Sequence, residues 1–238
     1  GNAEEEKKRT ETPASAFRVP RSPIRLLIAD DHDVVREGLK ALLAARADFR
    51  VCCEVSTGRE AVARARELKP HVAVLDFSMP ELNGLEATRQ IRKALPDTEV
   101  LILTMHDSET LAREVLAAGA RGFLLKPNAK RQLVAAVDAL AQHRPFFSGT
   151  LSASALDAFL HPDKHPAGAG APADRLTPRE REIVQLIAEG RSSKDIARQL
   201  GLSVKTADAH RTNVMRKLDL HSVSELVLYA VRNKIVQA

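Results

Sequence analysis

The stretch at residues 72–80, VAVLDFSMP, constrains the fold most, because an apolar run ends there at a single carboxylate, Asp76. A short run of this kind, bounded by polar residues, predicts a strand that is buried on both faces of a parallel sheet. Asp76 then lies at the carboxyl end of that strand, the edge at which open α/β sheets bind ligands. A single Asp at such a point also fits a helix cap, so its role depends on which other side chains reach the same edge.

Further apolar runs surround this one, and segments with helical periodicity separate them. The other expected strands lie at residues 24–29, 49–55, 99–104 and 121–125. The expected helices lie at residues 34–43, 60–68, 85–93, 108–118 and 131–143. Strands that alternate with helices in this way predict an α/β fold, a five-stranded doubly wound parallel sheet of order 2-1-3-4-5 with right-handed crossovers.

The chain divides into four segments by composition. Residues 1–22 are charged and lack apolar periodicity, so we expect a disordered leader. Residues 23–144 hold the predicted sheet. Residues 145–173 are rich in Pro, Gly and Ala and predict a linker, with one short helix expected at residues 152–160. A second domain follows at residues 174–238.

Helix signals mark out the second domain. Its first helix begins with LTPRE, in which Thr177 acts as the N-cap and Glu180 closes a capping box. A short helix at residues 193–200, a Gly turn and a longer helix at residues 204–218 come next, and a fourth helix follows. This order predicts a small all-α helix-turn-helix domain.

The composition limits where the protein works. Cys52 and Cys53 are adjacent in an expected strand, where consecutive side chains point to opposite faces, so a disulfide framework is not expected. No run approaches the roughly 20 apolar residues of a membrane span, and the N-terminus lacks the apolar core of a signal peptide. We therefore expect a soluble, cytoplasmic protein with no membrane partner.

Several polar side chains are expected at the same edge as Asp76. Asp30 and Asp31 directly follow the first strand, which neighbours the third in the expected order, so three carboxylates meet in one crevice. Such a group favours a cation, and hard oxygen ligands suit Mg²⁺. Thr104 and Lys126 end the fourth and fifth strands and add a hydroxyl and an ammonium. Phosphoryl transfer needs this set: an oxygen nucleophile, and positive or donor groups that face the phosphoryl oxygens.

Asp76 is followed by Met79 and Pro80, and Lys126 is followed by Pro127. With these neighbours, the set of Asp30, Asp31, Asp76, Thr104 and Lys126 closely resembles the receiver domain of bacterial two-component response regulators. The resemblance covers residues 24–144. It implies that Asp76 accepts a phosphoryl group from the phosphohistidine of a sensor histidine kinase, and that Lys126 binds the phosphoryl oxygens. It also implies that Mg²⁺ is held by Asp31, Asp76 and the backbone carbonyl of Ser78, with Asp30 completing the metal shell through water.

The same resemblance implies a conformational switch. Thr104 would turn inwards to the phosphoryl group, and Phe123 would take the place that Thr104 leaves; the alternative for Phe123 is an ordinary core aromatic. The Lys126–Pro127 bond resembles the cis peptide of the family, which would help to aim the lysine. His32, which follows the Asp pair, is interpreted as structural or solvent-facing rather than as a metal ligand.

The longer helix of the second domain, at residues 204–218, is basic. It carries one acid, Asp208, against the cations Lys205, Arg211, Arg216 and Lys217. A helix of this kind fits the DNA major groove, although a solvated helical face has a similar composition. The apolar positions Val204, Ala207, Val214 and Leu218 are expected to share a core with the preceding helix. The side chains then expected to face outwards are Lys205, Thr206, Asp208, Ala209 and Thr212.

From residue 174 onwards the sequences LTPREREIVQLIAEGRSSKDIARQLGLSVKT and HRTNVMRKLDLHS resemble the LuxR-type helix-turn-helix of the NarL/FixJ response regulators. The resemblance implies contacts with double-stranded DNA from Ser193, Lys205, Thr206, Asp208, Ala209, Arg211, Thr212 and Lys217. Ala207 departs from the family, which more usually has Val there; the change would loosen packing or alter a contact with a thymine methyl group. An apolar face of the last helix resembles the family's dimer contact, and its residues are Val223, Leu226, Val227 and Ala230.

Together the two resemblances predict a phosphorylation-controlled transcription regulator that binds DNA as a homodimer and is not an enzyme beyond its own phosphorylation and dephosphorylation. One alternative is a pseudo-receiver, which would control DNA binding without phosphorylation. Another is a phosphatase with an aspartyl-phosphate intermediate. Haloacid-dehalogenase-like phosphatases, however, carry a second Asp two residues after the nucleophile, and Ser78 stands there.

Overall fold

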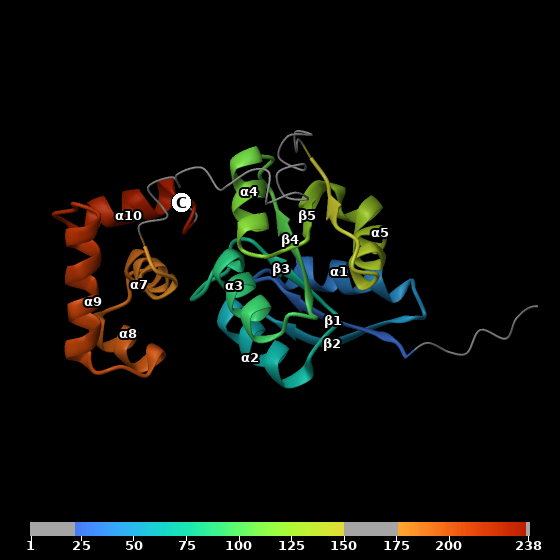
Figure 1. The fold of residues 1–238 in the computed structure, drawn as a ribbon, viewed down its shortest axis with the longest axis horizontal. Helices are drawn as coiled ribbons and strands as arrows, with labels where there is room; N and C mark the ends of the chain where they lie inside the picture. Colours follow the sequence, from blue (N-terminus) through green and yellow to red (C-terminus); the bar gives the residue numbers. More distant parts are fainter. Residues whose placement is uncertain (1–21, 150–175, 237–238) are drawn as a thin grey trace, which may run out of the picture.

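The computed structural model describes residues 22–149 and 176–236, which form an α/β domain followed by a helical domain (Figure 1). The helix expected at residues 152–160 lies outside the described residues, as does all but the last residue of the expected leader. Within the described parts of the chain, no helix has the length and apolar character needed to cross a membrane.

The α/β domain is built on one sheet of parallel strands, in the order β2-β1-β3-β4-β5-β6 among the described residues. The strands are β1 (Ile24–Ala29), β2 (Phe49–Val55), β3 (Val72–Asp76), β4 (Glu99–Thr104), β5 (Gly122–Leu125) and β6 (Phe146–Phe147). The predicted order of the first five strands is confirmed. The sixth strand corrects the prediction, because it falls in the segment assigned to the linker. A strand of two residues is too short to leave a recognisable pattern in the sequence.

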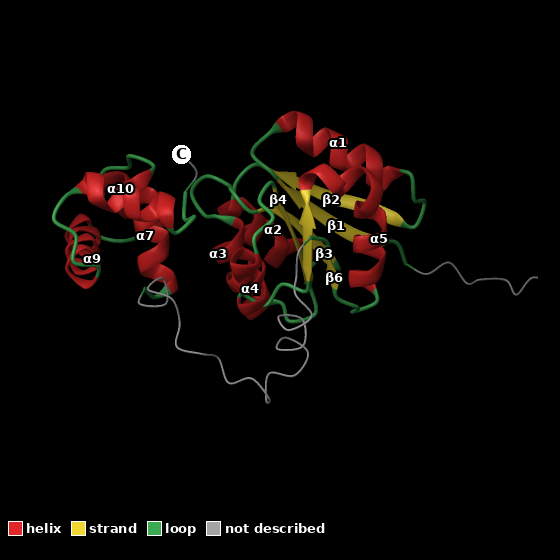
Figure 2. Ribbon diagram, turned by 90° about the horizontal axis from the view of Figure 1, so that it is seen from above, coloured by secondary structure: helices red, strands yellow, loops and turns green. Residues whose placement is uncertain are grey.

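Helices cover both faces of this sheet (Figure 2). They are α1 (Asp33–Ala44), α2 (Gly58–Leu68), α3 (Gly84–Ala94), α4 (Glu109–Ala117) and α5 (Ala129–Ala141), with a single 3₁₀ turn, η1 (Lys126–Asn128), before α5. The helical periodicity therefore located these helices correctly. Caps set their starts: the side chain of Asn83, for example, accepts a hydrogen bond from the backbone N–H of Glu86 at the start of α3 (2.9 Å).

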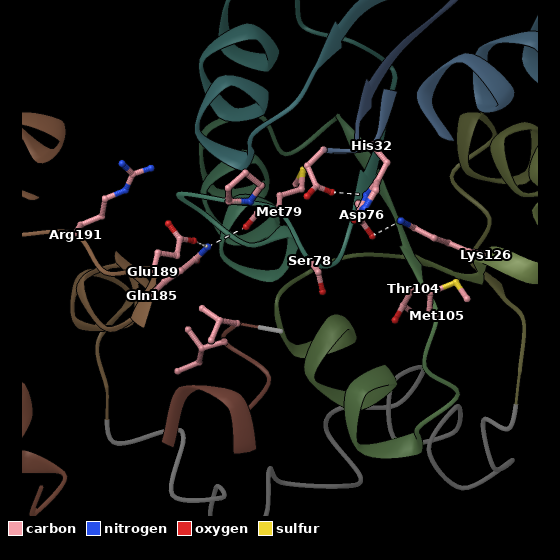
Figure 3. Close-up of a pocket in the computed structure, with 14 residues that line it drawn as sticks. His32, Asp76, Ser78, Met79, Thr104, Met105, Lys126, Gln185, Glu189 and Arg191 are labelled. Carbon is pink, nitrogen blue, oxygen red and sulfur yellow. Dashed lines mark hydrogen bonds and ion pairs between the residues drawn. The ribbon is translucent and has the colours of Figure 1, made fainter. Parts of the chain in front are cut away.

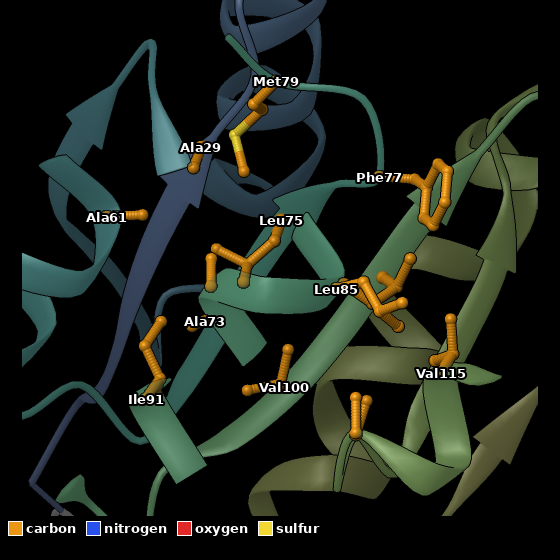
Figure 4. Packing of buried hydrophobic residues seen from close by; sticks show 14 of the residues in the cluster. Ala29, Ala61, Ala73, Leu75, Phe77, Met79, Leu85, Ile91, Val100 and Val115 are labelled. Carbon is orange, nitrogen blue, oxygen red and sulfur yellow. The ribbon is translucent and has the colours of Figure 1, made fainter. Parts of the chain in front are cut away.

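Successive side chains of each strand point to opposite faces of the sheet, so the core has two layers, one on each face. In β1, Leu27 and Ala29 pack with α2, α3 and α4, whereas Leu26 and Ile28 pack with α1 and α5. Figure 4 shows the first of these layers, in which Leu75 of β3 and Val100 of β4 lie among side chains from the covering helices. The strands are thus buried on both faces, as the continuous apolar runs predicted.

The second domain consists of α7 (Pro178–Ala188), α8 (Ser193–Leu200), α9 (Val204–Lys217) and α10 (Val223–Arg232) within the described residues. The predicted capping box at the start of α7 is present in both directions between Thr177 and Glu180. Gly201 ends α8 with a φ of 64°, a left-handed conformation that glycine adopts at little cost and that allows the tight turn into α9. The helix-turn-helix arrangement is confirmed.

The two domains meet where α7 packs against the loop between β3 and α3. The side chain of Gln185 on α7 accepts a hydrogen bond from the backbone N–H of Asn83 (2.8 Å) and donates one to the carbonyl oxygen of Met79 (2.9 Å). An ion pair joins Arg59 of α2 to Glu182 of α7 (2.6 Å). Helix α9 lies on the side of the second domain away from the sheet (Figures 1 and 2).

We predict that Gly84→Ala destabilises the α/β domain severely, because a Cβ at this position would lie 2.2 Å from the carbonyl oxygen of Asp76. The loss should be at least about 2 kcal/mol, since backbone on both sides of the contact must move. Gly38 in α1 is the matched control, because a Cβ there meets nothing within 4 Å, and Gly38→Ala should stabilise by about 0.5 to 1 kcal/mol. Urea unfolding followed by circular dichroism measures both changes. Equal stability of the two variants would contradict the prediction.

Candidate functional site

The register of the sheet brings the predicted polar residues to one edge. Ala29 pairs with Leu75, so Asp30, the next residue after β1, lies level with Asp76 at the end of β3. Thr104 pairs with Leu125, and this pairing sets Lys126 just beyond the end of β5. The carboxyl ends of four strands therefore present their polar residues together.

A lysine links two of the carboxylates. The Nζ atom of Lys126 donates a hydrogen bond to Asp30 (2.7 Å) and forms an ion pair with Asp76 (2.9 Å), as Figure 3 shows for the latter. Asp30 is fully buried and Asp76 is 4% exposed. Burial of two carboxylates is tolerated here because a single ammonium lies between them and both charges are hydrogen-bonded.

Burial and neighbouring charges shift the pKa values of Asp76 and Lys126. Burial raises the pKa of Asp76 to about 6; the Lys126 ammonium acts against this shift and the Asp30 carboxylate adds to it. Burial by itself would lower the pKa of Lys126, but its hydrogen bonds and its attraction to Asp30 and Asp76 outweigh burial, and the net shift is upward. The lysine is therefore held as a cation, facing the carboxylate that ends β3.

The donor set fits a hard divalent cation. Asp30, Asp31, His32 and Asp76 each offer a ligand atom, and these atoms lie within 4.8 Å of one another. Three of the four ligands are carboxylates with one lysine as counter-charge, so an additional cation would be stabilised among them. His32 is solvent-facing, as expected, with a side chain that is 67% exposed, but its Nδ1 lies 2.8 Å from Asp31 and belongs to the same cluster.

Five of the predicted site residues line one pocket. An open pocket of about 540 Å³ is lined by Asp31, Asp76, Ser78, Thr104 and Lys126, so these five converge. Thr104 is buried and its hydroxyl accepts a hydrogen bond from the backbone N–H of His106 (3.1 Å).

The structure also describes Phe123 and the Lys126–Pro127 peptide bond, which lie next to the pocket residues. Phe123 is 1% exposed and packs in the core layer with α2, α3 and α4, so this structure shows it as a core aromatic. The expected cis bond between Lys126 and Pro127 is not present, because no described residue has a cis peptide. Pro127 instead lies in the first turn of η1, where its fixed φ suits the 3₁₀ conformation.

The second domain also lines this pocket, which the sequence did not predict. One side of it is formed by Gln185 of α7, Glu189 at the C-cap of that helix, the nearby Arg191, and Ile235 and Val236 after α10. Figure 3 shows Gln185 and Glu189 beside Met79, on the loop that follows Asp76. A signal was present in the sequence: Glu182, Gln185 and Glu189 recur at helical spacing, but such a polar stripe also fits a solvated helical face.

The predicted DNA-contact residues of α9 form an exposed surface. The exposed ones are Lys205, Thr206, Asp208, Ala209, Thr212 and Lys217, and Arg211 is half-buried. Ser193, the predicted contact on α8, is half-buried as well. Lys217 also forms an ion pair with Glu180 of the capping box (2.8 Å). Ala207 is 2% exposed and packs in the domain core. An alanine where the family more usually has valine therefore affects packing rather than a thymine contact. Val204 was wrongly expected in that core: as the first residue of α9 it is 46% exposed.

The expected dimer face of α10 needs correction. Leu226 and Ala230 are fully buried in the core of the second domain, so they are not available to a partner. Helical periodicity finds an apolar stripe but does not tell whether it faces the domain's own core. Of the other two residues expected there, Val223 is exposed (40%) and Val227 is half-buried, and Leu228 (54%) is a further exposed apolar residue of α10.

We predict that Asp76→Asn stabilises the metal-free protein more at high pH than at low pH. The folded state holds the Asp76 proton more tightly than the unfolded state, so its stability falls as pH rises from about 4 to the folded pKa of about 6. Asparagine has no such titration, and the variant's advantage should be about 1 to 3 kcal/mol larger at about pH 7.5 than at about pH 4.5. Urea unfolding of both proteins without divalent metal tests this; an advantage independent of pH would contradict it.

Two family models match the chain, one for each domain. Residues 26–138 match the model described as response regulator receiver domain, and residues 174–230 match the one described as bacterial regulatory proteins, luxR family. The first range lies within the α/β domain, and the second covers α7, α8, α9 and most of α10.

Known proteins resemble the chain over both domains. The oxygen regulatory protein NreC of Staphylococcus epidermidis is 40% identical over 217 residues, which cover 90% of this chain and all of that protein. A solved structure of the RcsB response regulator from Salmonella typhimurium is 26% identical, with a TM-score of 0.51, and covers 89% of this chain and 100% of that one. A structure of an RcsB–DNA complex has a TM-score of 0.50 at 26% identity, covering 87% of this chain and 97% of that one. The chain therefore belongs to the NarL/FixJ family of two-component response regulators, in which a receiver domain and a LuxR-type DNA-binding domain form a phosphorylation-controlled transcription regulator.

Proposed function

We propose that Asp76 is the phosphoacceptor of this response regulator and that its donor is the phosphohistidine of a sensor histidine kinase. A carboxylate oxygen of Asp76 forms a bond to phosphorus, the phosphorus–nitrogen bond of the donor breaks, and the histidine nitrogen keeps the electron pair. The observation that carries this proposal is the ion pair between Asp76 and Lys126 (2.9 Å) at the end of β3, which lines an open pocket. Lys126 would then face the oxygens of the transferred group.

Mg²⁺ is the metal we propose for this pocket. Asp31 and Asp76 would hold it together with the carbonyl oxygen of Ser78, and Asp30 would complete the shell through water. The close carboxylate oxygens support this proposal, because they are hard ligands that suit Mg²⁺. When bound, the cation neutralises charge that develops on the phosphoryl oxygens.

Thr104 and Phe123 are the proposed link between this chemistry and the rest of the receiver. The Thr104 hydroxyl lines the pocket and is held by the N–H of His106, so it can exchange that partner for a phosphoryl oxygen. The adjacent strand holds Phe123, whose pairing partner in β4 is Ile102. Movement of Thr104 would open space that the aromatic ring enters. The phosphoryl group shifts this equilibrium only by as much as it binds one conformation better.

The exposed surface of α9 is proposed to bind double-stranded DNA, with Ser193 of α8 contributing to a backbone contact. We further propose that two chains bind as a homodimer, which would place two α9 helices on half-sites related by a two-fold axis. The exposed Val223 and Leu228 of α10 support such a contact. Because DNA and a cellular kinase are its partners, we place this regulator in the cytoplasm. Ser78 stands where a phosphatase would need a second carboxylate, so no turnover of other phosphate esters is proposed.

We predict that acetyl phosphate with Mg²⁺ adds one phosphoryl group to the wild-type chain and none to Asp76→Ala. The reason is that Asp76 is the carboxylate that Lys126 directs into the open pocket. Intact mass measures the added group, and DNA affinity is measured on the same samples. Phosphorylation that persists in Asp76→Ala, or DNA affinity that is equal with and without the donor, would contradict the proposal.

We predict that Lys205→Ala weakens DNA binding and lowers the slope of log affinity against log salt by about one, the value expected when one phosphate contact is lost. The residue is exposed in the first turn of α9. Lys93→Ala, which removes an exposed lysine from α3, is the charge-matched control and should leave the slope unchanged. A Lys205→Ala protein with the wild-type salt dependence would exclude a phosphate contact from this residue.

A further inference from the structure

We infer that Ser148 is a positioning residue for Lys126: its hydroxyl holds the end of β5 in the conformation from which the lysine faces Asp76 and a bound phosphoryl group. The inference rests on the proposed function of Asp76. It gives a role to the short strand β6 and to the residue that follows it.

The outer edge of β5 is paired with β6. The carbonyl oxygens of Arg121 and Phe123 accept hydrogen bonds from the N–H groups of Phe146 (3.0 Å) and Ser148 (2.9 Å). Alternate residues of a strand in a parallel ladder bond to the same neighbour, so Leu125 is the next residue of β5 that faces β6. The N–H of Leu125 donates to the Oγ atom of Ser148 (3.2 Å). A side-chain oxygen thus extends the ladder by one bond beyond the end of β6.

This last bond is made at the residue directly before the functional lysine. Leu125 ends β5 and is the N-cap residue of η1, whose first residue is Lys126. Its register partner in β4 is Thr104. Ser148 is 6% exposed, so water competes little for its hydroxyl. The hydroxyl therefore lies beside the pair of strand ends that carries Thr104 and Lys126.

Lys126 is held at its tip and at its base. The ammonium contacts Asp30 (2.7 Å) and Asp76 (2.9 Å). A charge on a flexible four-carbon stem keeps one direction only if the backbone is fixed as well. Phosphorylation replaces the Asp76 carboxylate as a partner of the ammonium, so the backbone then decides whether the lysine reaches the phosphoryl oxygens. Ser148 fixes that backbone from the side of β5 opposite to β4.

The chain after Ser148 is closely fitted to the receiver. It turns at Gly149, which has a φ of 110°, a conformation that favours glycine. A Cβ at this position would lie 2.8 Å from Oδ1 of Asp107, so the backbone passes close to the loop that follows Thr104. Gly149 is the last described residue before residues 150–175, which lead to the second domain. The segment that positions Lys126 is therefore also the start of the connection between the domains.

Positioning and phosphoryl binding are coupled in both directions. If the Ser148 bond favours the conformation that binds the phosphoryl group, then binding stabilises that bond by the same factor. Without the bond, a smaller fraction of molecules has the lysine in place, and the apparent affinity for the phosphoryl group falls with that fraction. The proposed Mg²⁺ ligands Asp31, Asp76 and Ser78 lie outside β5 and β6, so the metal affinity should not fall with it.

The test uses the full chain as wild type and as the variants Ser148→Ala, Ser148→Thr and Thr57→Ala. Ser148→Thr keeps the hydroxyl. Thr57 is the matched control, because its hydroxyl also accepts a backbone N–H in the receiver, that of Glu60 (3.1 Å), but at the start of α2. Thermal unfolding confirms that each protein is folded. Two affinities are then measured: that for Mg²⁺ alone, and that for beryllofluoride in saturating Mg²⁺, a tetrahedral mimic of a phosphoryl group on a carboxylate.

Two further measurements follow the positioning itself. The NMR signal of the Lys126 Cε group, assigned by its loss in Lys126→Arg, reports the surroundings of the lysine in the ligand-free protein. Hydrogen exchange of the Leu125 and Ser148 amides reports the pairing of β5 with β6.

We expect Ser148→Ala to bind beryllofluoride about threefold to tenfold more weakly than wild type, the range that loss of one hydrogen bond implies, and to bind Mg²⁺ as well as wild type does. Its Lys126 signal should shift and its Leu125 amide should exchange faster. Beryllofluoride should slow exchange of the Ser148 amide in wild type. Ser148→Thr and Thr57→Ala should match wild type in all of these measurements.

Equal beryllofluoride affinity of wild type and Ser148→Ala would overturn the inference, as would a loss of Mg²⁺ affinity as large as the loss of beryllofluoride affinity. A Ser148→Thr protein as weak as Ser148→Ala would also overturn it, because the hydroxyl would not be the group that matters. A wild-type chain that binds no beryllofluoride would instead refute the proposed function. The Lys126 signal and the Leu125 exchange would then still decide whether Ser148 positions the lysine.

Discussion

The arrangement of this protein depends on one ammonium held between two buried carboxylates. Asp30 is fully buried and Asp76 nearly so, and Lys126 reaches both from the end of β5. Removing the lysine from this group would leave two uncompensated buried carboxylates, and uncompensated buried charge typically costs about 3 to 5 kcal/mol. The sheet register places the three residues together, and the negative charge that the lysine does not neutralise favours an additional cation beside them.

The loop after β3 connects this chemistry to the rest of the molecule. On one side it continues from Asp76, and Gly84 at its far end packs against the carbonyl of that residue too closely for any side chain. On the other side its backbone is held by Gln185 and Glu189 of the DNA-binding domain. A segment of only a few residues thus joins the carboxylate to the contact with the second domain. The contacts between the domains include the hydrogen bonds of Gln185 and Glu189 and the ion pair of Arg59 with Glu182, and water can replace each of these if the domains separate.

Much of the fold could be predicted because its signals are local. The apolar run that ends at Asp76 identified a strand buried on both faces, and the capping box at Thr177 located the start of α7. The convergence of Asp31, Ser78 and Lys126 followed from strand order alone, since parallel strands end at one edge. What escaped prediction depends on tertiary contacts. Three such features are the pairing of β6, the burial of Leu226 on α10 and the contact of Gln185 with the loop. Each depends on which surfaces pack together, and the periodicity of a sequence does not predict that.

The most direct test of the account is calorimetric titration of the full chain with Mg²⁺, for wild type and for Asp31→Ala. Asp31 belongs to the acidic cluster but forms no hydrogen bond with Lys126, so its removal leaves the buried ion pairs in place. The account predicts one Mg²⁺ site per wild-type chain and an affinity at least about tenfold weaker in the variant, the usual effect of losing one charged ligand or its direct support. A wild-type chain that binds no Mg²⁺, or a variant that binds it equally well, would contradict the claim that these carboxylates form a phosphoryl-transfer site.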